Sequence, residues 1–167
     1  MLLVTHLAAA AVIGRRPGLP TAPLLVGAAA PDLVDKPLGA AGVTELYHSV
    51  GHSALALAAL LAVALYSRAG APLAPAPPAT AAVAVAAGWA SHLLLDAVHV
   101  VLNGRPGHAL FLLWPLARSS DPLGLPPVAF VRHYVGTPSF YLEIVLWLAL
   151  IGLFVRGRRR DAPTAGD

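Results

Sequence analysis

The segment ATAAVAVAAGWASHLLLDAVHVVL, residues 79–102, decides the fold class of this chain. It is apolar for longer than the roughly 20 residues that a helix needs to cross a bilayer. It nevertheless contains His92, Asp96 and His99, which stand at positions i, i+4 and i+7 and therefore share one helix face. Ionisable side chains within a membrane are costly and are usually functional. The segment therefore predicts a transmembrane helix that carries a site.

The composition of the whole chain agrees with this prediction. Of its 167 residues 57% are hydrophobic and only 11% are charged, and the mean hydropathy is +0.73. A soluble domain is roughly a quarter charged, so too little polar surface remains here to solvate a globule. The absence of cysteine excludes disulfides and thiolate ligands, so nitrogen and oxygen atoms must hold any bound metal.

Two further apolar runs, residues 49–66 and 139–155, are long enough to span a bilayer. The second begins with aromatic residues and ends at four closely spaced arginines, Arg156, Arg158, Arg159 and Arg160. This order is typical of an aromatic belt at one interface and a basic anchor at the cytoplasmic one. Residues 67–78, rich in Pro and Ala, read as a short loop. Within the proline-rich connection 103–138, the apolar stretch 109–116 is expected to form a re-entrant or interfacial segment.

The N-terminal third contains shorter apolar stretches, residues 1–14 and 24–30. The first would be about 21 Å long as a helix, which is short for a full span, so the two are expected to form a helical hairpin of half-spans. The predicted fold is an all-α, small polytopic membrane helix bundle. We expect one transmembrane domain over residues 1–155 and a basic, disordered cytoplasmic tail over 156–167. This tail favours an anionic membrane surface as partner and not a nucleic acid.

The polar residues of the three long runs fall at one predicted depth. At the helical rise, His52 lies about 21 Å from the inner end of its run, His92 about 20 Å and Glu143 about 18 Å. Asp32, Asp35 and His6 are expected near the same level if the N-terminal hairpin forms, and so is His48, four residues before His52. The sequence thus predicts that these side chains converge.

The donor types point to a metal. Imidazole and carboxylate groups without sulfur suit a divalent ion, zinc by preference, with manganese or iron as alternatives. His52, His92 and Asp96 are the predicted ligands, with Asp32 or Asp35 completing the shell. A site with three protein ligands leaves a position open for water, which makes hydrolysis possible.

Four motifs in chain order resemble the membrane-bound metal-dependent hydrolase family: PDLVDKP at 31–37, Gly-His-Ser at 51–53, SHLLLDAVH at 91–99 and LFLLWPL at 110–116. Related members are described as inner-membrane-associated hydrolases that bind the LexA repressor. The resemblance implies a place in the cytoplasmic membrane of a prokaryote and a metal held by Asp32, Asp35, His52, His92, Asp96 and His6. The chain departs from the family pattern where Lys36 follows Asp35, and where Ser49 and Gly51 replace Arg and Thr.

Hydrolysis is the favoured function. A divalent ion would activate water, with Asp35 or Asp96 as general base; Asp35 is preferred because a loop position would let it reach that water. A lipid-like substrate would suit a site near the outer interface. Two alternatives remain: a structural or regulatory membrane protein stapled by its metal, and an ion or proton transporter, which donors at one level only disfavour. Individually, Asp32 could cap a helix, Asp35 could pair with Lys36, and Glu143 with Arg132 or His133.

Overall fold

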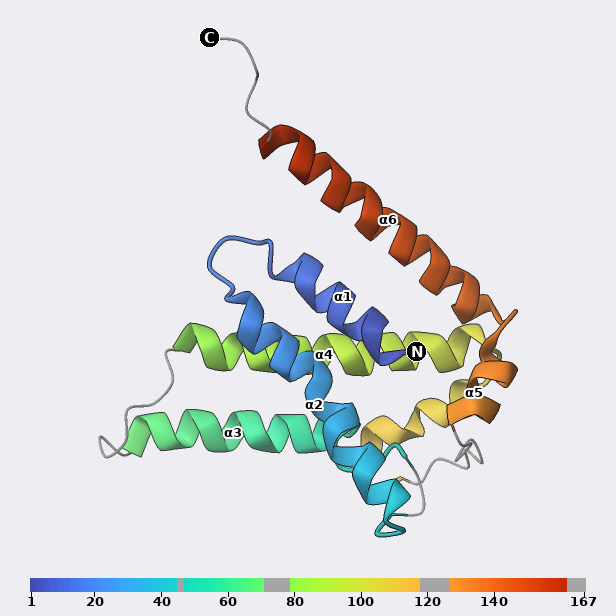
Figure 1. The fold of residues 1–167 in the computed structure, drawn as a ribbon. Helices are drawn as coiled ribbons and strands as arrows, with labels where there is room; N and C mark the ends of the chain where they lie inside the picture. The colour runs from blue at the N-terminus through green and yellow to red at the C-terminus, as the bar shows by residue number, and fades with distance from the viewer. Residues whose placement is uncertain (45–46, 71–78, 118–126, 162–167) are drawn as a thin grey trace.

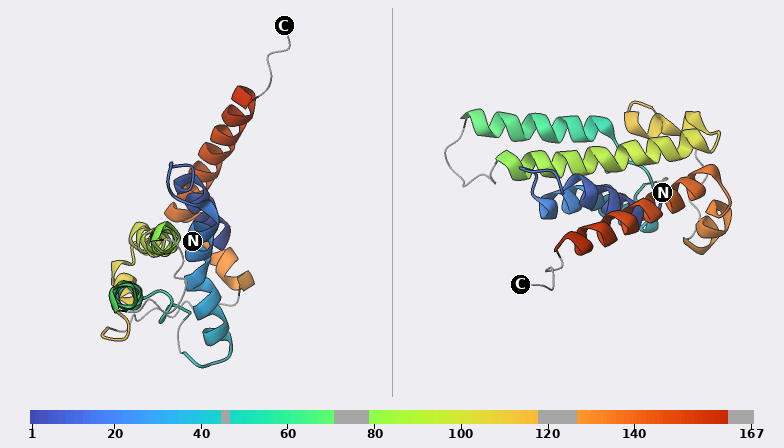
Figure 2. Two further views of the ribbon diagram at one scale, coloured as in Figure 1. Left: turned by 90° about the vertical axis from the view of Figure 1, so that its left-hand side faces the viewer. Right: turned by 90° about the horizontal axis from the view of Figure 1, so that it is seen from above.

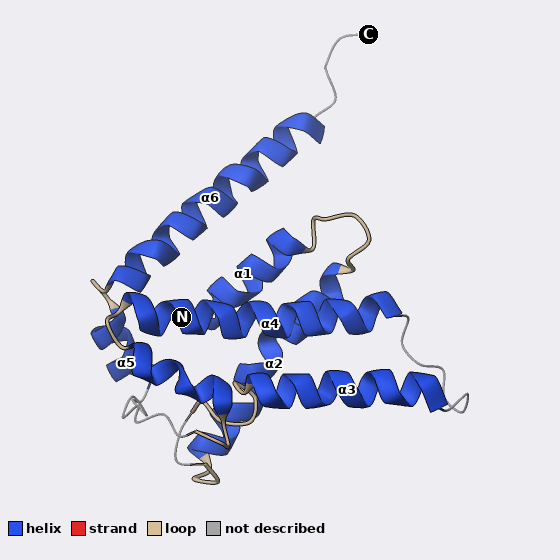
Figure 3. Ribbon diagram, turned by 180° about the vertical axis from the view of Figure 1, so that it is seen from behind, coloured by secondary structure: helices blue, strands red, loops and turns tan. Residues whose placement is uncertain are grey.

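The computed structural model describes residues 1–44, 47–70, 79–117 and 127–161, and these form seven helices and no strand (Figures 1 and 3). The all-α prediction is therefore confirmed for the described residues. In chain order the helices are α1 (Leu3–Ile13), α2 (Thr21–Ala40), α3 (Ala54–Gly70), α4 (Ala79–Leu102), the 3₁₀ helix η1 (Pro106–Leu113), α5 (Pro127–Tyr134) and α6 (Pro138–Asp161).

Two helices in the described part of the chain are long and apolar enough to cross a membrane. They are Ala81–Leu102 within α4 and Pro138–Gly157 within α6, which coincide with the predicted spans 79–102 and 139–155. The third predicted span, 49–66, is not confirmed, because α3 begins only at Ala54 and has 17 residues. Residues 49–53 are not helical, because the backbone N–H groups of Ser49, Gly51 and His52 bind a side chain of α2, as described below.

Helix α4 is the centre of the bundle. It contacts α1, α2, α3, η1 and α6. Figure 1 shows α3 lying alongside α4 and α2 crossing it, and Figure 2 shows the C-terminal end of α6 leading away from the other helices. Helix α6 packs mainly against α1 and α4. Much of its apolar surface, including Leu148 and Phe154, is therefore exposed.

Glycines allow α2 and α4 to cross closely. A Cβ atom added at Gly27 would lie 2.0 Å from the carbonyl oxygen of Val85, and one added at Gly88 would lie 2.1 Å from that of Leu24. Either distance is far inside van der Waals contact, so no larger residue fits without separating the helices. Leu24, Ala28, Ala84 and Ala10 form the small buried core beside this crossing. The close approach brings the backbone of α2 within reach of side chains on α4.

The N-terminal hairpin differs from its prediction in one respect. Helix α2 does not end before Pro31 but continues through Pro31 and Pro37 to Ala40. A proline removes one internal hydrogen bond and normally breaks or kinks a helix. Here Pro31 is buried, and Gly51 packs against its backbone so closely that a Cβ there would lie 2.6 Å from the Pro31 carbonyl oxygen. Asp35 consequently lies on a helix and not on the loop expected from the sequence.

Three other segments were predicted more coarsely. Helix η1 covers most of the predicted re-entrant stretch 109–116 and contacts α3 and α4. Of the predicted loop 67–78, residues 67–70 belong to α3 and residues 71–78 lie outside the described part. Of the predicted disordered tail, residues 156–161 belong to α6 and residues 162–167 lie outside the described part.

Candidate metal centre

Three donor atoms meet at the crossing of α2 and α4. The Nε2 atoms of His52 and His92 lie 3.2 Å apart, and Oδ2 of Asp96 lies 3.4 Å from the first and 3.3 Å from the second. Zinc binds such donors at about 2.0–2.1 Å in tetrahedral geometry, which separates neighbouring donors by about 3.3 Å. The spacing of this group, called here the donor triangle, is therefore that of three ligands around one small divalent ion.

The hydrogen bonds of both imidazole rings fix which nitrogen is free. Nδ1 of His92 lies 2.7 Å from the carbonyl oxygen of Ala28, and Nδ1 of His52 lies 2.7 Å from a carboxylate oxygen of Asp35. A carbonyl or carboxylate oxygen can only accept, so each Nδ1 carries the proton and donates it. In the neutral rings each Nε2 then presents a lone pair toward the centre of the triangle, as a metal ligand must.

Asp35 holds His52 in place. Its two oxygens accept hydrogen bonds from the Ser49 backbone N–H and hydroxyl group, from the backbone N–H groups of Gly51 and His52, and from His52 Nδ1. Burial raises the pKa of Asp35, but the bonds from His52, Gly51 and Ser49 outweigh it and lower the pKa to about 2. The carboxylate is thus ionised and fully engaged, and it acts on the centre through His52.

The segment that carries His52 is fixed from two more sides. Trp89 Nε1 on α4 donates to the Gly51 carbonyl oxygen at 2.8 Å. The Ser53 hydroxyl donates to the Trp114 carbonyl oxygen at 2.6 Å. The Gly-His-Ser segment is therefore held by contacts with α2, with α4 and with the end of η1. His52 does not depend on helical geometry for its position.

Further donors surround the triangle. The described residues contain three overlapping groups whose donor atoms all lie within 4.8 Å of one another: His6, His92 and Asp96; Asp32, His52 and His92; and His48, His52 and Asp96. His6 is fully buried, and its ring stacks on His92 with 3.7 Å between centroids. Its Nε2 lies 3.2 Å from Asp96 Oδ1 without hydrogen-bond geometry. The Met1 amino group binds the same oxygen at 2.8 Å.

Asp32 and His48 approach from the more open side. Asp32 Oδ1 lies 3.6 Å from His52 Nε2 and 3.3 Å from Lys36 Nζ. His48 Nε2 lies 3.8 Å from Asp96 Oδ2, and its ring packs against Phe111. The sequence places His48 near the level of the other donors only through its four-residue spacing from His52. That spacing assumed a helix, whereas residues 48–52 are not helical, so proximity arises from the turn.

Two other candidates from the sequence lie in a separate polar group, called here the α6 cluster. It consists of His99, Asn103, Tyr134, Ser139 and Glu143. His99 Nδ1 lies 2.8 Å from the Ser139 hydroxyl, and Glu143 accepts hydrogen bonds from the Tyr134 hydroxyl and the Leu2 backbone N–H. Burial and the bond to Glu143 raise the pKa of Tyr134 well above its usual range. Glu143 thus pairs with Tyr134 and not with Arg132 or His133.

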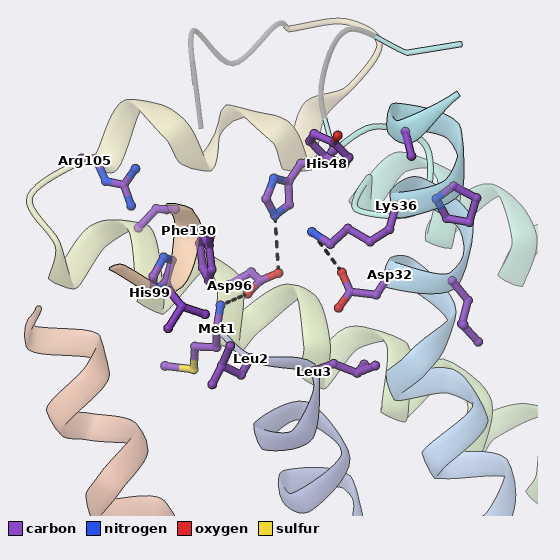
Figure 4. A pocket seen from close by; sticks show the side chains of 16 residues that line it. Met1, Leu2, Leu3, Asp32, Lys36, His48, Asp96, His99, Arg105 and Phe130 are labelled. Atoms are coloured by element: carbon purple, nitrogen blue, oxygen red, sulfur yellow. Dashed lines mark hydrogen bonds and ion pairs between the residues drawn. The ribbon is translucent and has the colours of Figure 1, made fainter. Parts of the chain in front are cut away.

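A cavity of about 620 Å³ adjoins the donor triangle (Figure 4). Asp96 lines it directly, as do Asp32 and His48 beside the triangle. Most of its other walls are apolar. The donor triangle is therefore buried in the protein yet reachable by a small molecule through this cavity.

Comparisons of this chain with protein-family models, with curated proteins and with solved structures found no match. What the site can do therefore follows from its own chemistry. Buried imidazole and carboxylate donors that face one another can hold a divalent metal ion.

Proposed function

We propose that this protein is a membrane-embedded, metal-dependent hydrolase. The observation that carries the proposal is the donor triangle: three buried donors at 3.2–3.4 Å from one another, two from α4 and one from the turn before α3. When bound, a divalent ion such as zinc would lower the pKa of a water molecule and polarise the scissile group. The adjoining cavity supplies what a purely structural metal site lacks, which is room for a substrate.

The chain's own residues divide the work. His52, His92 and Asp96 are the ligands in this proposal. Asp32 is the general base, because its carboxylate faces both His52 Nε2 and the cavity. The sequence favoured Asp35 for that role, but both of its oxygens accept hydrogen bonds from residues 49–52. Asp35 is therefore a positioning residue that orients His52 and raises its basicity.

Membrane embedding is part of the same proposal. The apolar lengths of α4 and α6 support it, and so do the large exposed apolar side chains of α6, such as Tyr141, Leu148 and Phe154. The cytoplasmic membrane of a prokaryote and membership of the membrane-bound metal-dependent hydrolase family are proposed on the four sequence motifs alone. Membrane lipid is then the immediate partner of the helices, and a lipid-like substrate would reach the cavity from it.

The experiment is elemental analysis of the detergent-purified protein together with a substrate panel. Wild-type protein should contain one equivalent of a divalent metal and hydrolyse a phosphoester, carboxylester or amide in a chelator-sensitive way. His92→Ala should lose both the metal and the turnover. His99→Ala is the matched control, since His99 lies on the same helix but bonds to Ser139; it should keep the metal.

Three results would contradict the proposal. Metal absent from wild-type protein after growth in metal-replete medium would remove its basis. Equal metal loss in His92→Ala and His99→Ala would show that the metal does not report on the donor triangle. Metal retained at one equivalent with no chelator-sensitive turnover on any substrate of the panel would favour the structural alternative.

A further inference from the structure

The cavity beside the donor triangle has two kinds of wall, and together they describe a substrate. Its volume of about 620 Å³ lies within the range of about 300–1,000 Å³ found for small-molecule sites. One end is polar, where Asp32, His48 and Asp96 face it. The remainder is lined mainly by hydrocarbon side chains. A molecule that fits must therefore have a polar group at one end and an apolar body.

The apolar part is large enough for an alkyl chain. It is lined by residues from the N-terminus, α2, α4 and α5: Leu2, Leu3, Leu33, Val100, Phe130 and Val131. Leu33 and Val131 are also exposed at the protein surface, so this lining continues outward. Each methylene group that leaves water for such a lining adds to binding. A chain of several methylene groups would bind more tightly than a short one.

The polar end carries positive charge from two directions. Figure 4 shows Arg105 and Lys36 on either side of Asp96 and His48. Lys36 Nζ lies 3.3 Å from Asp32 Oδ1, and its side chain is half exposed. With a divalent ion at the donor triangle, that ion, Lys36, Arg105 and the Met1 amino group would face this end against the two carboxylates of Asp32 and Asp96. An anionic head group is therefore favoured there.

We propose that the substrate is a phosphate ester of a long-chain alcohol, a specification that rests on the proposed hydrolase function. A phosphate ester carries negative charge that the cations lining this end can attract, whereas a carboxylic ester or an amide is neutral. Arginine in particular binds phosphate through two parallel hydrogen bonds. Asp96 lies six residues before the end of α4 at Leu102, about 9 Å along the helix, which is a suitable depth for a lipid head group.

The reaction is a hydrolysis and needs no other reactant. A water oxygen forms a bond to phosphorus, and the bond between phosphorus and the ester oxygen breaks. Asp32 accepts one proton from the water, and this proton passes on to the departing ester oxygen, which becomes the free alcohol. The products are the long-chain alcohol and inorganic phosphate.

The test is direct binding of dodecyl phosphate to metal-loaded protein in a neutral detergent, measured by calorimetry. Inorganic phosphate and dodecyltrimethylammonium are the comparison ligands. Dodecyl phosphate should bind at least about tenfold more tightly than either, because only it combines an anionic head group for the polar end with an alkyl chain for the apolar lining. Arg105→Gln should weaken its binding about tenfold or more, and Arg105→Lys should recover part of the loss. Arg132→Gln is the matched control, since Arg132 is exposed on α5 and does not line the cavity.

Metal content and turnover are recorded on the same samples. Release of phosphate from dodecyl phosphate that exceeds the release of acetate from dodecyl acetate would support the proposal. Equal binding of dodecyl phosphate and dodecyltrimethylammonium, or wild-type affinity in Arg105→Gln, would overturn it. Failure of the proposed function itself would look different, because the wild-type protein would then contain no metal or would hydrolyse no substrate of the panel in a chelator-sensitive way. Chelator-sensitive cleavage of dodecyl acetate alone would overturn the phosphate specification and leave the hydrolase standing.

Discussion

Two buried polar clusters lie along the C-terminal half of α4, and they differ in how their polar atoms are satisfied. In the α6 cluster donors meet acceptors: the Tyr134 hydroxyl donates to Glu143 at 2.6 Å, and the Asn103 side chain donates to the Ser139 hydroxyl at 2.8 Å. In the donor triangle, each neutral histidine carries its proton on Nδ1. The two Nε2 atoms and Asp96 Oδ2 then face one another with lone pairs and no proton between them. The two clusters use similar residue types, but only the α6 cluster satisfies its polar atoms by hydrogen bonds among its own members.

This difference separates a structural role from a site. Buried polar groups are normally hydrogen-bonded, and one without a partner costs free energy. A cluster that pairs internally, like the one around Ser139, gains specific packing between helices and needs nothing else. A cluster of facing acceptors is stabilised by a cation, and in the donor triangle the Met1 amino group binds Asp96 Oδ1 but leaves the three facing atoms to a metal ion. His92 and His99 share one face of α4, yet only the first belongs to such a cluster, so residue type and helical spacing alone do not distinguish them.

The largest expected effect is the response of the donor triangle to metal. Adding zinc at about one hundred times its dissociation constant should stabilise the metal-free protein by about 2.7 kcal/mol, because the ion relieves the facing lone pairs. Asp96→Asn should show no such response, since it removes the anionic ligand. Thermal unfolding in detergent, followed with and without zinc, measures both. If none of zinc, manganese or iron changes the stability of the wild-type protein, the donor triangle is not a metal site and does not differ from the α6 cluster in this way.

Much of the fold was predictable, because it depends on local sequence. Apolar length alone located the helix at 79–102 and most of the one at 139–155. The start of α3 could not be located in this way, because the backbone N–H groups of Ser49, Gly51 and His52 bind Asp35 and residues 49–53 are not helical. Likewise, the passage of α2 through Pro31 depends on packing against Gly51. Both departures come from contacts between segments far apart in the chain.

The sequence was enough to predict which residues form the candidate site, but not what each of them does there. Depth along the expected helices grouped His52, His92 and Asp96, and the structure brings these three together. The same reasoning placed Glu143 at that level without showing that it would bond to Tyr134. It also made Asp35 a general base, since a sequence cannot show that both oxygens of a carboxylate accept backbone N–H groups. Roles depend on hydrogen bonds, which spacing does not specify.

The next effect concerns the link between Asp35 and His52. Asp35→Asn removes the negative charge and replaces one of the two acceptor oxygens by an NH2 donor, which weakens the hold on Nδ1 of His52. We expect the metal affinity to fall by about 10–100-fold, with metal still bound at saturating concentration. Competition with a fluorescent chelator measures the affinity. Ser49→Ala is the control, because it removes one bond to Asp35 and leaves the His52 contact intact. A loss in Ser49→Ala as large as in Asp35→Asn would assign Asp35 a purely structural role.

The α6 cluster should respond in stability alone. Tyr134→Phe removes the hydroxyl that donates to Glu143 and leaves a buried carboxylate oxygen without this donor. The expected loss is about 1–3 kcal/mol in the free energy of unfolding, with the metal content unchanged. Tyr141→Phe, an exposed change on α6, should have little effect. Metal loss in Tyr134→Phe would mean that the two clusters are one functional unit.

The smallest effect is expected where α6 meets α1. Trp147 Nε1 donates to the Thr5 hydroxyl at 3.2 Å, a hydrogen bond between neutral groups on two helices. Trp147→Phe should therefore cost about 0.5–1.5 kcal/mol, and a double-mutant cycle with Thr5→Val isolates the pairwise part from the loss of ring area. Thr5 and His6 are neighbours on α1, so the cycle also tests how far the clusters are coupled. A metal affinity that stays at the wild-type value in Trp147→Phe would show that the donor triangle is held by α2 and α4 without help from α6. An affinity that falls together with stability would show that α6 positions His6 against the donor triangle. The α6 cluster and the donor triangle would then be one coupled unit along α4, and the distinction between a hydrogen-bonded cluster and a metal-binding one would not hold.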